Sequence, residues 1–385
     1  MSNIYLDNKI KSSCNGCGVC ALICPQNCIK MIEDSEGFLY PEIDENKCIK
    51  CNKCRRLCSN NPISNEFSIQ AYATKNKNNE QRKQSTSGGM FKILAEYVIE
   101  RQGVVFGVEI MDDLKVVHDY AESMQECKKF SASKYVRSEL NNSYRKVKEF
   151  LNQDRYVLFT GTPCQNEGLR KFLGKDSNKL ILCEIICHAN PSPKVFNMYI
   201  RNIENKTGKS VKMIYFRSKN AEMNNSSYIE LKDGTKIADK LYNKAFSSKQ
   251  LINRPSCYNC KFVDENRKAD FTIGDFWGIE NIFPDFNDNK GISLLTVNTS
   301  KAEKIFEEIK DKMDYKKVEI KKAFEKNHNS NVPINPHREI FFEKIAAGKI
   351  NENNIIRYMK KYTRTALYKK VLNRVKNHNV LLKKE

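Results

Sequence analysis

Residues 14–24 read C-N-G-C-G-V-C-A-L-I-C and are followed at once by Pro25, and residues 48–58 repeat the cysteine spacing as C-I-K-C-N-K-C-R-R-L-C. In each run, three cysteines at this spacing suit one iron–sulfur cubane while the fourth crosses to the other cubane. Four-cysteine zinc sites also use C-x2-C, but zinc does not explain the third and fourth cysteines of each run. The spacing therefore predicts a ferredoxin-like segment with two 4Fe-4S clusters. The ligands of one cluster are Cys14, Cys17, Cys20 and Cys58, and those of the other are Cys24, Cys48, Cys51 and Cys54.

Four further residues of this segment bear on the cluster interpretation. Gly16 and Gly18 let the backbone wrap closely around a cluster and aim N–H groups at its sulfurs. Ser59 stands where the second run would have its proline. Cys28 is the ninth cysteine of the segment and has no place in the spacing, so we interpret it as a small packing residue.

Length and cysteine usage indicate a chain of several domains in a reducing compartment. With 385 residues, 40% of them hydrophobic, the chain is long enough for two or three domains with a proper core. The cysteines crowd at metal-ligand spacing and the first residues, M-S-N-I-Y-L-D-N-K, form no apolar leader, which favours the cytoplasm. No apolar run reaches the length of about 18 residues that a membrane span needs.

The formal net charge of +20 would by itself suggest a nucleic-acid partner. Each oxidised cluster with its four thiolates carries a net charge of about −2, so bound clusters offset part of this excess. Much of the remainder lies in residues 357–385, where Glu385 is the single acid among many lysines and arginines. We therefore expect no nucleic-acid partner.

The basic helical tail, residues 346–385, does not fit one straight amphipathic helix. The apolar residues of its first half share one helical face, and those of its second half share nearly the opposite face. The first set is Ile355, Met359, Tyr362 and Ala366, and the second is Tyr368, Val371, Leu372 and Val375. Two short helices with a bend near residues 364–367 are predicted. They either dock on the body of the protein or make a peripheral contact with a membrane surface.

Between the two ends, the hydrophobic pattern alternates between strands and helices. The predicted strands are 68–73, 104–108, 155–160, 179–186 and 269–276, and the predicted helices are 90–100, 166–173 and 194–205. Residues 75–89 and 161–165 are expected to be loops, and residues 211–240 a hairpin-rich insertion. This alternation predicts a mixed α/β fold in which helices pack on a sheet.

Six cysteines lie outside the N-terminal segment, and one of them, Cys127, stands alone. The other five lie in three stretches that begin or end at predicted strand termini, where the loops of a sheet converge in space. We predict a third cluster with the ligands Cys164, Cys187, Cys257 and Cys260. Cys183 falls within a predicted strand, where a core residue is more usual than a cluster ligand. It is the alternative to Cys187 as the fourth ligand of this cluster. A structural zinc ion, or no metal at all, is the alternative.

Several motifs stand in order along residues 66–345. They are S-T-S-G-G-M (85–90), S-K-Y-V-R-S (133–138), G-T-P-C-Q-x-x-G-L-R (161–170), C-H-x-x-P-S-P (187–193), R-P-S-C-Y-N-C-K-F (254–262) and A-D-F-T-I-G-D-F-W-G (269–278). In these motifs the chain resembles the coenzyme F420 hydrogenase/dehydrogenase beta-subunit family. The resemblance implies a flavin domain in two halves (66–150 and 151–345). This domain would lie between the 2x 4Fe-4S ferredoxin domain (1–62) and the basic tail (346–385).

Members of this family bind FAD and an iron–sulfur cluster, so the resemblance implies FAD contacts. Ser87, Gly88 and Gly89 precede a helix, and their N–H groups are expected to hold the pyrophosphate of FAD. The remaining expected FAD contacts are Lys134 as a phosphate charge, Tyr135 as a stacking ring and Thr162 as a hydrogen-bonding group. The alternatives are a polar loop with an N-cap serine and a solvated lysine. Asp275 and Trp277 are either part of this site or a turn residue and a core anchor.

The resemblance also implies an oxidoreductase that passes electrons between a hydride-exchanging organic substrate, FAD and the clusters. The implied partners are an F420-like deazaflavin as hydride donor or acceptor and a redox protein or complex. Hydride transfer needs no protein base, and no catalytic residue is assigned. Two alternatives are a reductase of a glycan precursor in cell-surface polysaccharide synthesis and an electron-transfer adaptor without catalysis. The expected location is the cytoplasm, either free or at the membrane periphery.

Overall fold

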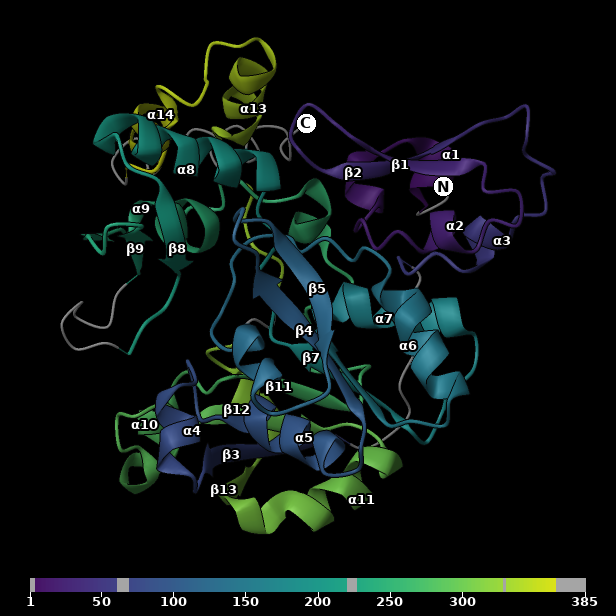
Figure 1. Cartoon of the computed structure of the whole chain (residues 1–385), viewed down its shortest axis with the longest axis vertical. Helices are drawn as coiled ribbons and strands as arrows, with labels where there is room; N and C mark the ends of the chain where they lie inside the picture. The colour runs from purple at the N-terminus through teal and green to yellow at the C-terminus, as the bar shows by residue number, and fades with distance from the viewer. Residues whose placement is uncertain (1–3, 61–68, 220–226, 328–329, 365–385) are drawn as a thin grey trace, which may run out of the picture.

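The computed structural model describes residues 4–60, 69–219, 227–327 and 330–364 of the chain. These residues form three lobes (Figure 1). The iron–sulfur lobe (residues 4–60, purple) lies at the upper right of the view, and the helical lobe (193–253 and 330–364) lies at the upper left. The sheet lobe, which contains most of the remaining residues, lies below and between them.

The iron–sulfur lobe is a small helix-and-hairpin unit. Its elements are α1 (Tyr5–Asn8), α2 (Val19–Leu22), β1 (Ile29–Glu33), β2 (Leu39–Ile43) and α3 (Lys53–Arg56). β1 and β2 are antiparallel. Their turn is fixed by Asp34, whose Oδ1 accepts the backbone N–H groups of Glu36 (3.1 Å) and Phe38 (2.9 Å). The hairpin separates the two cysteine runs, and the short helices α2 and α3 contact each other.

The sheet lobe is built on an eight-stranded mixed sheet with the order β13-β3-β12-β11-β7-β6-β4-β5. Its strands are β3 (Gln70–Asn76), β4 (Val104–Ile110), β5 (Val116–Ala121), β6 (Val157–Gly161), β7 (Leu180–Ile185), β11 (Phe271–Asp275), β12 (Ser293–Val297) and β13 (Met313–Val318). The four central strands β11, β7, β6 and β4 are parallel, and the outer pairs are antiparallel. The carboxyl ends of the four parallel strands therefore meet at one edge of the sheet.

Helices cover both faces of this sheet. The helices of the lobe are α4 (Asn79–Lys83), α5 (Met90–Ile99), α6 (Ser143–Asn152), α7 (Pro163–Leu173), α10 (Ile279–Ile282), α11 (Ser300–Ile309) and α12 (Ile320–Phe324). Successive residues of β6 point to opposite faces, so Leu158 joins the core under α5 and α11 whereas Phe159 joins the core under α6 and α7. Burial on both faces explains why the parallel strands are continuously apolar.

The helical lobe combines a small antiparallel sheet with helices. Its elements are α8 (Pro193–Thr207), β8 (Val211–Tyr215), β9 (Tyr228–Leu231), β10 (Lys236–Ala238), α9 (Leu241–Asn243), α13 (Arg338–Ala346) and α14 (Ile355–Tyr362). The sheet order is β10-β9-β8. α8 begins where Ser192 accepts the N–H of Val195 through its Oγ (3.2 Å), and Pro193 occupies the first helical position.

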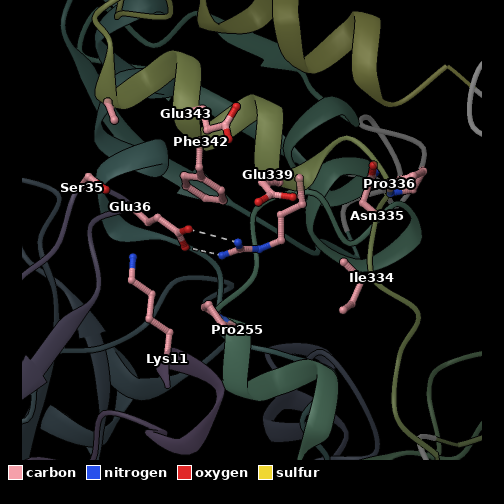
Figure 2. A pocket seen from close by; sticks show the side chains of 12 residues that line it. Lys11, Ser35, Glu36, Pro255, Ile334, Asn335, Pro336, Glu339, Phe342 and Glu343 are labelled. Carbon is pink, nitrogen blue, oxygen red and sulfur yellow. Dashed lines mark hydrogen bonds and ion pairs between the residues drawn. The ribbon is translucent and has the colours of Figure 1, made fainter. Parts of the chain in front are cut away.

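The iron–sulfur lobe is docked firmly on the helical lobe. Phe38 and Tyr40 of the hairpin belong to the core of the helical lobe, with 1% and 3% of their surfaces exposed. Arg338 of α13 forms a two-pronged ion pair with Glu36, and Lys11 and Phe342 lie beside it in the same groove (Figure 2). This contact joins the turn between β1 and β2 to α13.

The mixed α/β fold predicted from the sequence is confirmed. The predicted strands in the centre of the chain and the helices at 90–100 and 194–205 agree with β4, β6, β7, β11, α5 and α8. The predicted loop 75–89 was wrong in part, because β3 extends to Asn76 and α4 follows it. The predicted helix at 166–173 starts earlier, at Pro163, because Thr162 and Gln165 form a capping box.

The first helix of the predicted tail docks on the body. α14 buries Ile355, Met359 and Tyr362 in the helical lobe. The predicted bend at 364–367 and the face formed by Tyr368, Val371, Leu372 and Val375 lie outside the described residues, apart from Arg364. In the described part of the chain, no helix is long and apolar enough to cross a membrane.

The predicted domain limits lie at different places in this fold. The limit between residues 62 and 66 lies outside the described residues. The limit at 150/151 falls inside α6, and the one at 345/346 falls inside α13. The division into four parts stays a prediction.

Candidate functional site

The first thiol group consists of Cys14, Cys17, Cys20 and Cys58. Gly16 and Gly18 both adopt positive φ angles, +73° and +76°, and this turn places Cys20 on α2. Burial raises the pKa of Cys20, and the charges of its three partner thiols raise that pKa further. Burial likewise raises the pKa of Cys58 to about 12. Ser59 donates a hydrogen bond from Oγ to Cys17 Sγ (2.9 Å). The structure thus brings the four predicted ligands together.

The second thiol group consists of Cys24, Cys48, Cys51 and Cys54. These four thiols line one pocket, which also contains Cys28. The Cys28 Sγ lies 3.3 Å from the Cys24 Sγ, and this hydrogen bond, together with burial, raises the pKa of Cys28 to about 12. Cys28 therefore does more than fill the core: it lies among the predicted ligands.

The third thiol group consists of Cys164, Cys187, Cys257 and Cys260. The four residues line one small pocket, although they come from α7, the loop after β7 and the segment before β11. Burial raises the pKa of Cys187, and the charges of the other three thiols add to the effect. Cys183 is fully buried in the core under α5 and α11 and does not line this pocket. Of the two alternatives left open by the sequence, the structure places Cys187 with the other thiols. Cys127 is buried in the same core as Cys183.

The first and third thiol groups are neighbours. Asn15 and Asn60 of the iron–sulfur lobe line the pocket of the third group. Arg137 spans the two groups: one guanidinium nitrogen lies 3.6 Å from Cys164 Sγ, and the other donates to the carbonyl of Gly16 (2.8 Å). The sequence placed Arg137 only beside Lys134 and Tyr135 in the S-K-Y-V-R-S motif. Nothing in it related Arg137 to the thiol groups, because its two partners lie 27 and 121 residues away.

Arg254 connects the same two regions from the other side. It is 2% exposed, and it donates to the carbonyls of Cys14 (2.8 Å) and Leu39 (2.9 Å). Its guanidinium also lies over the rings of Tyr40 and Phe38, at 4.3 and 5.3 Å from their centroids. Buried arginines with this many partners hold a precise geometry. Arg254 therefore fixes the loop of the first thiol group next to the third.

All three groups have the donor chemistry that iron–sulfur clusters require. Their donors are buried or half-buried thiols, and four thiolates can hold one 4Fe-4S cluster. Within the described ranges, no set of three or more His, Cys, Asp or Glu side chains has a geometry that could hold a single metal ion.

A larger cavity of about 470 Å³ lies at the carboxyl ends of the parallel strands. We call it the sheet cavity. Residues at the ends of β6, β7 and β11 line it, as does the N-terminus of α5. In sheets with parallel strands this edge is the usual place for a ligand. Cys187, His188, Ala189 and Asn190 line both this cavity and the pocket of the third thiol group, so the two share a wall.

Most of the residues predicted to contact FAD line the sheet cavity. They are Ser87, Gly89, Lys134, Tyr135 and Thr162. Gly88 differs, because its N–H already donates to Ser293 Oγ (2.9 Å) and a side chain there would meet the carbonyl oxygen of Thr74. The prediction that Gly88 offers its N–H to a phosphate is therefore corrected: Gly88 allows the loop to pack tightly against the sheet.

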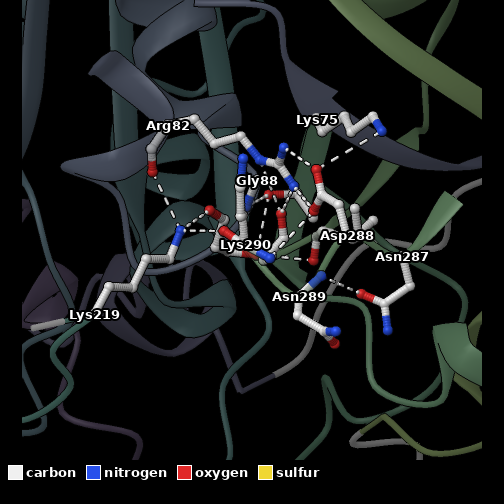
Figure 3. Close-up of polar contacts among 12 residues, drawn as sticks. Lys75, Arg82, Gly88, Lys219, Asn287, Asp288, Asn289 and Lys290 are labelled. Atoms are coloured by element: carbon white, nitrogen blue, oxygen red, sulfur yellow. Dashed lines mark hydrogen bonds and ion pairs between the residues drawn. The ribbon is translucent and has the colours of Figure 1, made fainter. Parts of the chain in front are cut away.

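The loop that carries Ser87 is held by charged side chains (Figure 3). Arg82 is 4% exposed, forms a two-pronged ion pair with Asp288 and donates to the carbonyl of Gly291. Lys219 donates to the carbonyls of Ser87 (2.7 Å) and Arg82 (3.2 Å). Burial, followed by the charge of Arg82, lowers the pKa of Lys219 to about 8. At the start of α5, Gly89, Met90 and Phe91 line the cavity.

Lys134 and Tyr135 also line the cavity. Lys134 Nζ donates to the carbonyls of Ser131 (2.6 Å) and Lys129 (3.1 Å), and burial lowers its pKa to about 7. The ring of Tyr135 packs against Phe246, with a centroid distance of 5.1 Å. Lys134 is therefore a polar group at the cavity and not the solvated lysine of the alternative interpretation.

Thr162 stands between the cavity and the third thiol group. Its Oγ1 lies 3.3 Å from Cys164 Sγ and donates to Gln165 Oε1 (2.9 Å). This places a hydroxyl beside the sulfur of Cys164.

Three further residues, Asp275, Arg217 and Trp277, line the cavity. Asp275, at the end of β11, forms an ion pair with Arg217, and both residues line the cavity. Trp277 also lines the cavity and is 53% exposed, so it is not a core anchor. The sequence singled out Asp275 and Trp277 by their position after a strand, but it gave no signal for Arg217.

These observations define the class of the protein: an iron–sulfur electron-transfer protein with a second, ligand-sized cavity beside its thiol groups. Residues 13–61 match the 4Fe-4S dicluster domain. Residues 154–323 match the family model described as the C terminus of the coenzyme F420 hydrogenase/dehydrogenase beta subunit. The resemblance seen in the sequence is thus confirmed.

Individual proteins were also compared with this chain. A solved structure of the F420-reducing [NiFe] hydrogenase complex from Methanosarcina barkeri contains a similar chain, with 17% identity and a TM-score of 0.45. The match covers 76% of the present chain and 91% of that chain. No curated protein matches the present chain.

Proposed function

We propose that this protein is a flavin-dependent oxidoreductase that exchanges hydride with an organic substrate and passes the electrons through three 4Fe-4S clusters to a redox protein. The single observation that carries this proposal is the wall shared by the sheet cavity and the third thiol group. A hydride acceptor in the cavity would lie next to a one-electron carrier. A bound flavin would convert the two-electron hydride transfer into single-electron steps, because it accepts an electron pair and releases electrons one at a time.

Contacts between the sites support one order of electron transfer. The sheet cavity adjoins the third thiol group, and Arg137 and Arg254 join the third group to the loop of the first. Cys24 of the first cysteine run belongs to the second group, so the two groups of the iron–sulfur lobe are neighbours along the chain. The second group lies at the surface, where Ile49 is 61% exposed. We therefore assign the second group to the exchange of electrons with the partner.

The lining of the sheet cavity supports FAD as the resident group. The N-terminus of α5 lies at the cavity, and because the first N–H groups of a helix have no partner within it, this end suits a pyrophosphate. Lys134 adds a titratable charge, and Tyr135 adds an aromatic wall. The volume falls in the range of small-molecule sites, about 300–1,000 Å³.

The substrate side of the proposal follows from the mouth of the cavity. Trp277 presents an exposed ring, and Arg217 with Asp275 presents a charged pair. A planar heteroaromatic substrate such as an F420-like deazaflavin would stack on the ring and bind the pair through polar groups. No general base is assigned, because a hydride moves with its own electron pair.

The experiment that tests the proposal is anaerobic purification of the full chain from the cytoplasmic fraction. We expect about twelve irons for three clusters, and flavin absorption near about 450 nm after the clusters are extracted. Coenzyme F420, NADH and NADPH are then added separately, and bleaching of the cluster absorption is followed. Bleaching by coenzyme F420 supports the proposal. A preparation that binds clusters but neither binds FAD nor bleaches with any of these donors contradicts it.

A further inference from the structure

Cys28 lies inside the second thiol group although the two-cluster spacing gives it no role. Its side chain is only 3% exposed. It stands directly before β1, and its carbonyl accepts the N–H of Asp44 (2.8 Å), which continues the ladder between β1 and β2. The hairpin therefore holds Cys28 beside Asp44, shortly before the second cysteine run begins at Cys48.

The sulfur of Cys28 is placed as a ligand would be. Its Sγ lies 3.3 Å from the Sγ of Cys24, so the two sulfurs are in contact. Both thiols line the pocket that also holds Cys48, Cys51 and Cys54. Five thiols thus surround a site where a 4Fe-4S cluster needs four.

The first thiol group offers a natural comparison within the same lobe. There the side chain in contact with a ligand sulfur is Ser59, whose hydroxyl donates to Cys17 (2.9 Å). A serine hydroxyl is a harder donor than a thiolate and a poor replacement for it on iron. The two groups therefore differ in one respect: only the second has a spare thiol against one of its ligands in the described part of the lobe.

We propose that Cys24 and Cys28 form an interchangeable ligand pair, so that either sulfur completes the coordination of the second cluster. This inference rests on the proposed iron–sulfur function. In the exchange, the Cys28 thiol loses its proton to solvent and forms the sulfur–iron bond, and the Cys24 sulfur leaves the iron and takes up a proton. One bond forms and one breaks, and no electron is gained or lost.

The position of the second group near the surface suggests why a second ligand would be useful. This cluster would be the one closest to solvent and to the redox partner, since Ile49 and Lys50 beside it are exposed. A cluster at the surface is open to loss of a ligand through oxidation or through the binding of a partner. A second thiol in contact with the first retains the cluster through such an event.

The test compares variants of the full chain, all purified anaerobically. They are Cys24→Ala, Cys28→Ala, the double variant Cys24→Ala/Cys28→Ala, and Cys58→Ala as the control in the first thiol group. Iron and labile sulfide are counted, and the electron paramagnetic resonance spectrum is recorded after reduction. Cys24→Ser and Cys28→Ser are made in parallel, in case an alanine variant fails to fold.

The two single variants of the pair are expected to retain the iron content of the wild type. The double variant and Cys58→Ala are each expected to lose about four irons. The inference is overturned if Cys24→Ala loses as much iron as the double variant, or if Cys28→Ala alone loses it. If the wild type itself holds no clusters, the proposed function fails, which is a different result from a failure of the pair.

Discussion

Replacement of Lys134 by methionine tests the proposed FAD site. Lys134 lines the sheet cavity, and burial lowers its pKa to about 7. A pyrophosphate bound beside it would favour the charged form. Binding therefore needs a protonated Lys134, and above pH 7 it must be accompanied by proton uptake.

The magnitude follows from the titration of one group. With a pKa of about 7, the protonated fraction falls from about one half at pH 7 to about one hundredth at pH 9. The affinity for FAD is expected to fall by roughly 50-fold over this interval, provided that the bound lysine stays charged. Below pH 6 the lysine is already charged, and the affinity levels off. Lys134→Met should bind FAD more weakly at pH 6 and show a flat profile.

The assay is an anaerobic titration of the flavin-free chain with FAD, followed by quenching of flavin fluorescence between pH 6 and pH 9. Lys134→Arg is the matched control, because arginine stays charged throughout and should give a flat profile at high affinity. Riboflavin, which lacks the pyrophosphate, should show no such dependence. Equal slopes for the wild type and Lys134→Met would refute the assignment of Lys134 to the phosphate.

Three further predictions concern the thiols, the lobe interface and the cavity mouth. Cys164→Ala should lower the iron content by about four, whereas Cys183→Ala should keep all iron and lower the free energy of unfolding by about 1 kcal/mol; equal iron loss in both would contradict the third thiol group. Arg338→Met should lower the free energy of unfolding in urea by about 3 kcal/mol, because it leaves Glu36 unpaired and largely buried. The double variant Glu36→Gln/Arg338→Met should recover part of this loss, and no recovery would count against the ion pair. Trp277→Leu should change stability by less than about 0.5 kcal/mol but weaken the binding of a planar substrate several-fold in equilibrium titrations; unchanged affinity would remove Trp277 from the site.

The sequence predicted those parts of the site that depend on local spacing. Cysteines two residues apart can reach one cluster wherever the segment lies, so the first two thiol groups could be predicted without a fold. The choice of Cys187 over Cys183 followed from the position of each residue in its strand, because a residue within a strand faces a core.

The remaining features depend on contacts between distant segments. Arg254 reaches Cys14 across 240 residues, and no pattern in the sequence relates the two. Gly88 was expected to offer its N–H to a ligand, but Ser293 on β12 takes this N–H. The role of Cys28 could not be predicted either, because it depends on how the β1–β2 hairpin folds back against the second cysteine run.

The exposed ring at the mouth of the sheet cavity has a practical consequence. Trp277 is the one tryptophan in the whole chain, so the tryptophan emission of the protein comes from a single known place. A bound flavin would lie within range for energy transfer from this indole, and a substrate that stacks on the ring would change both its emission maximum and its anisotropy. The native protein thus carries its own optical probe of cavity occupancy, and ligands can be screened against it without labelling.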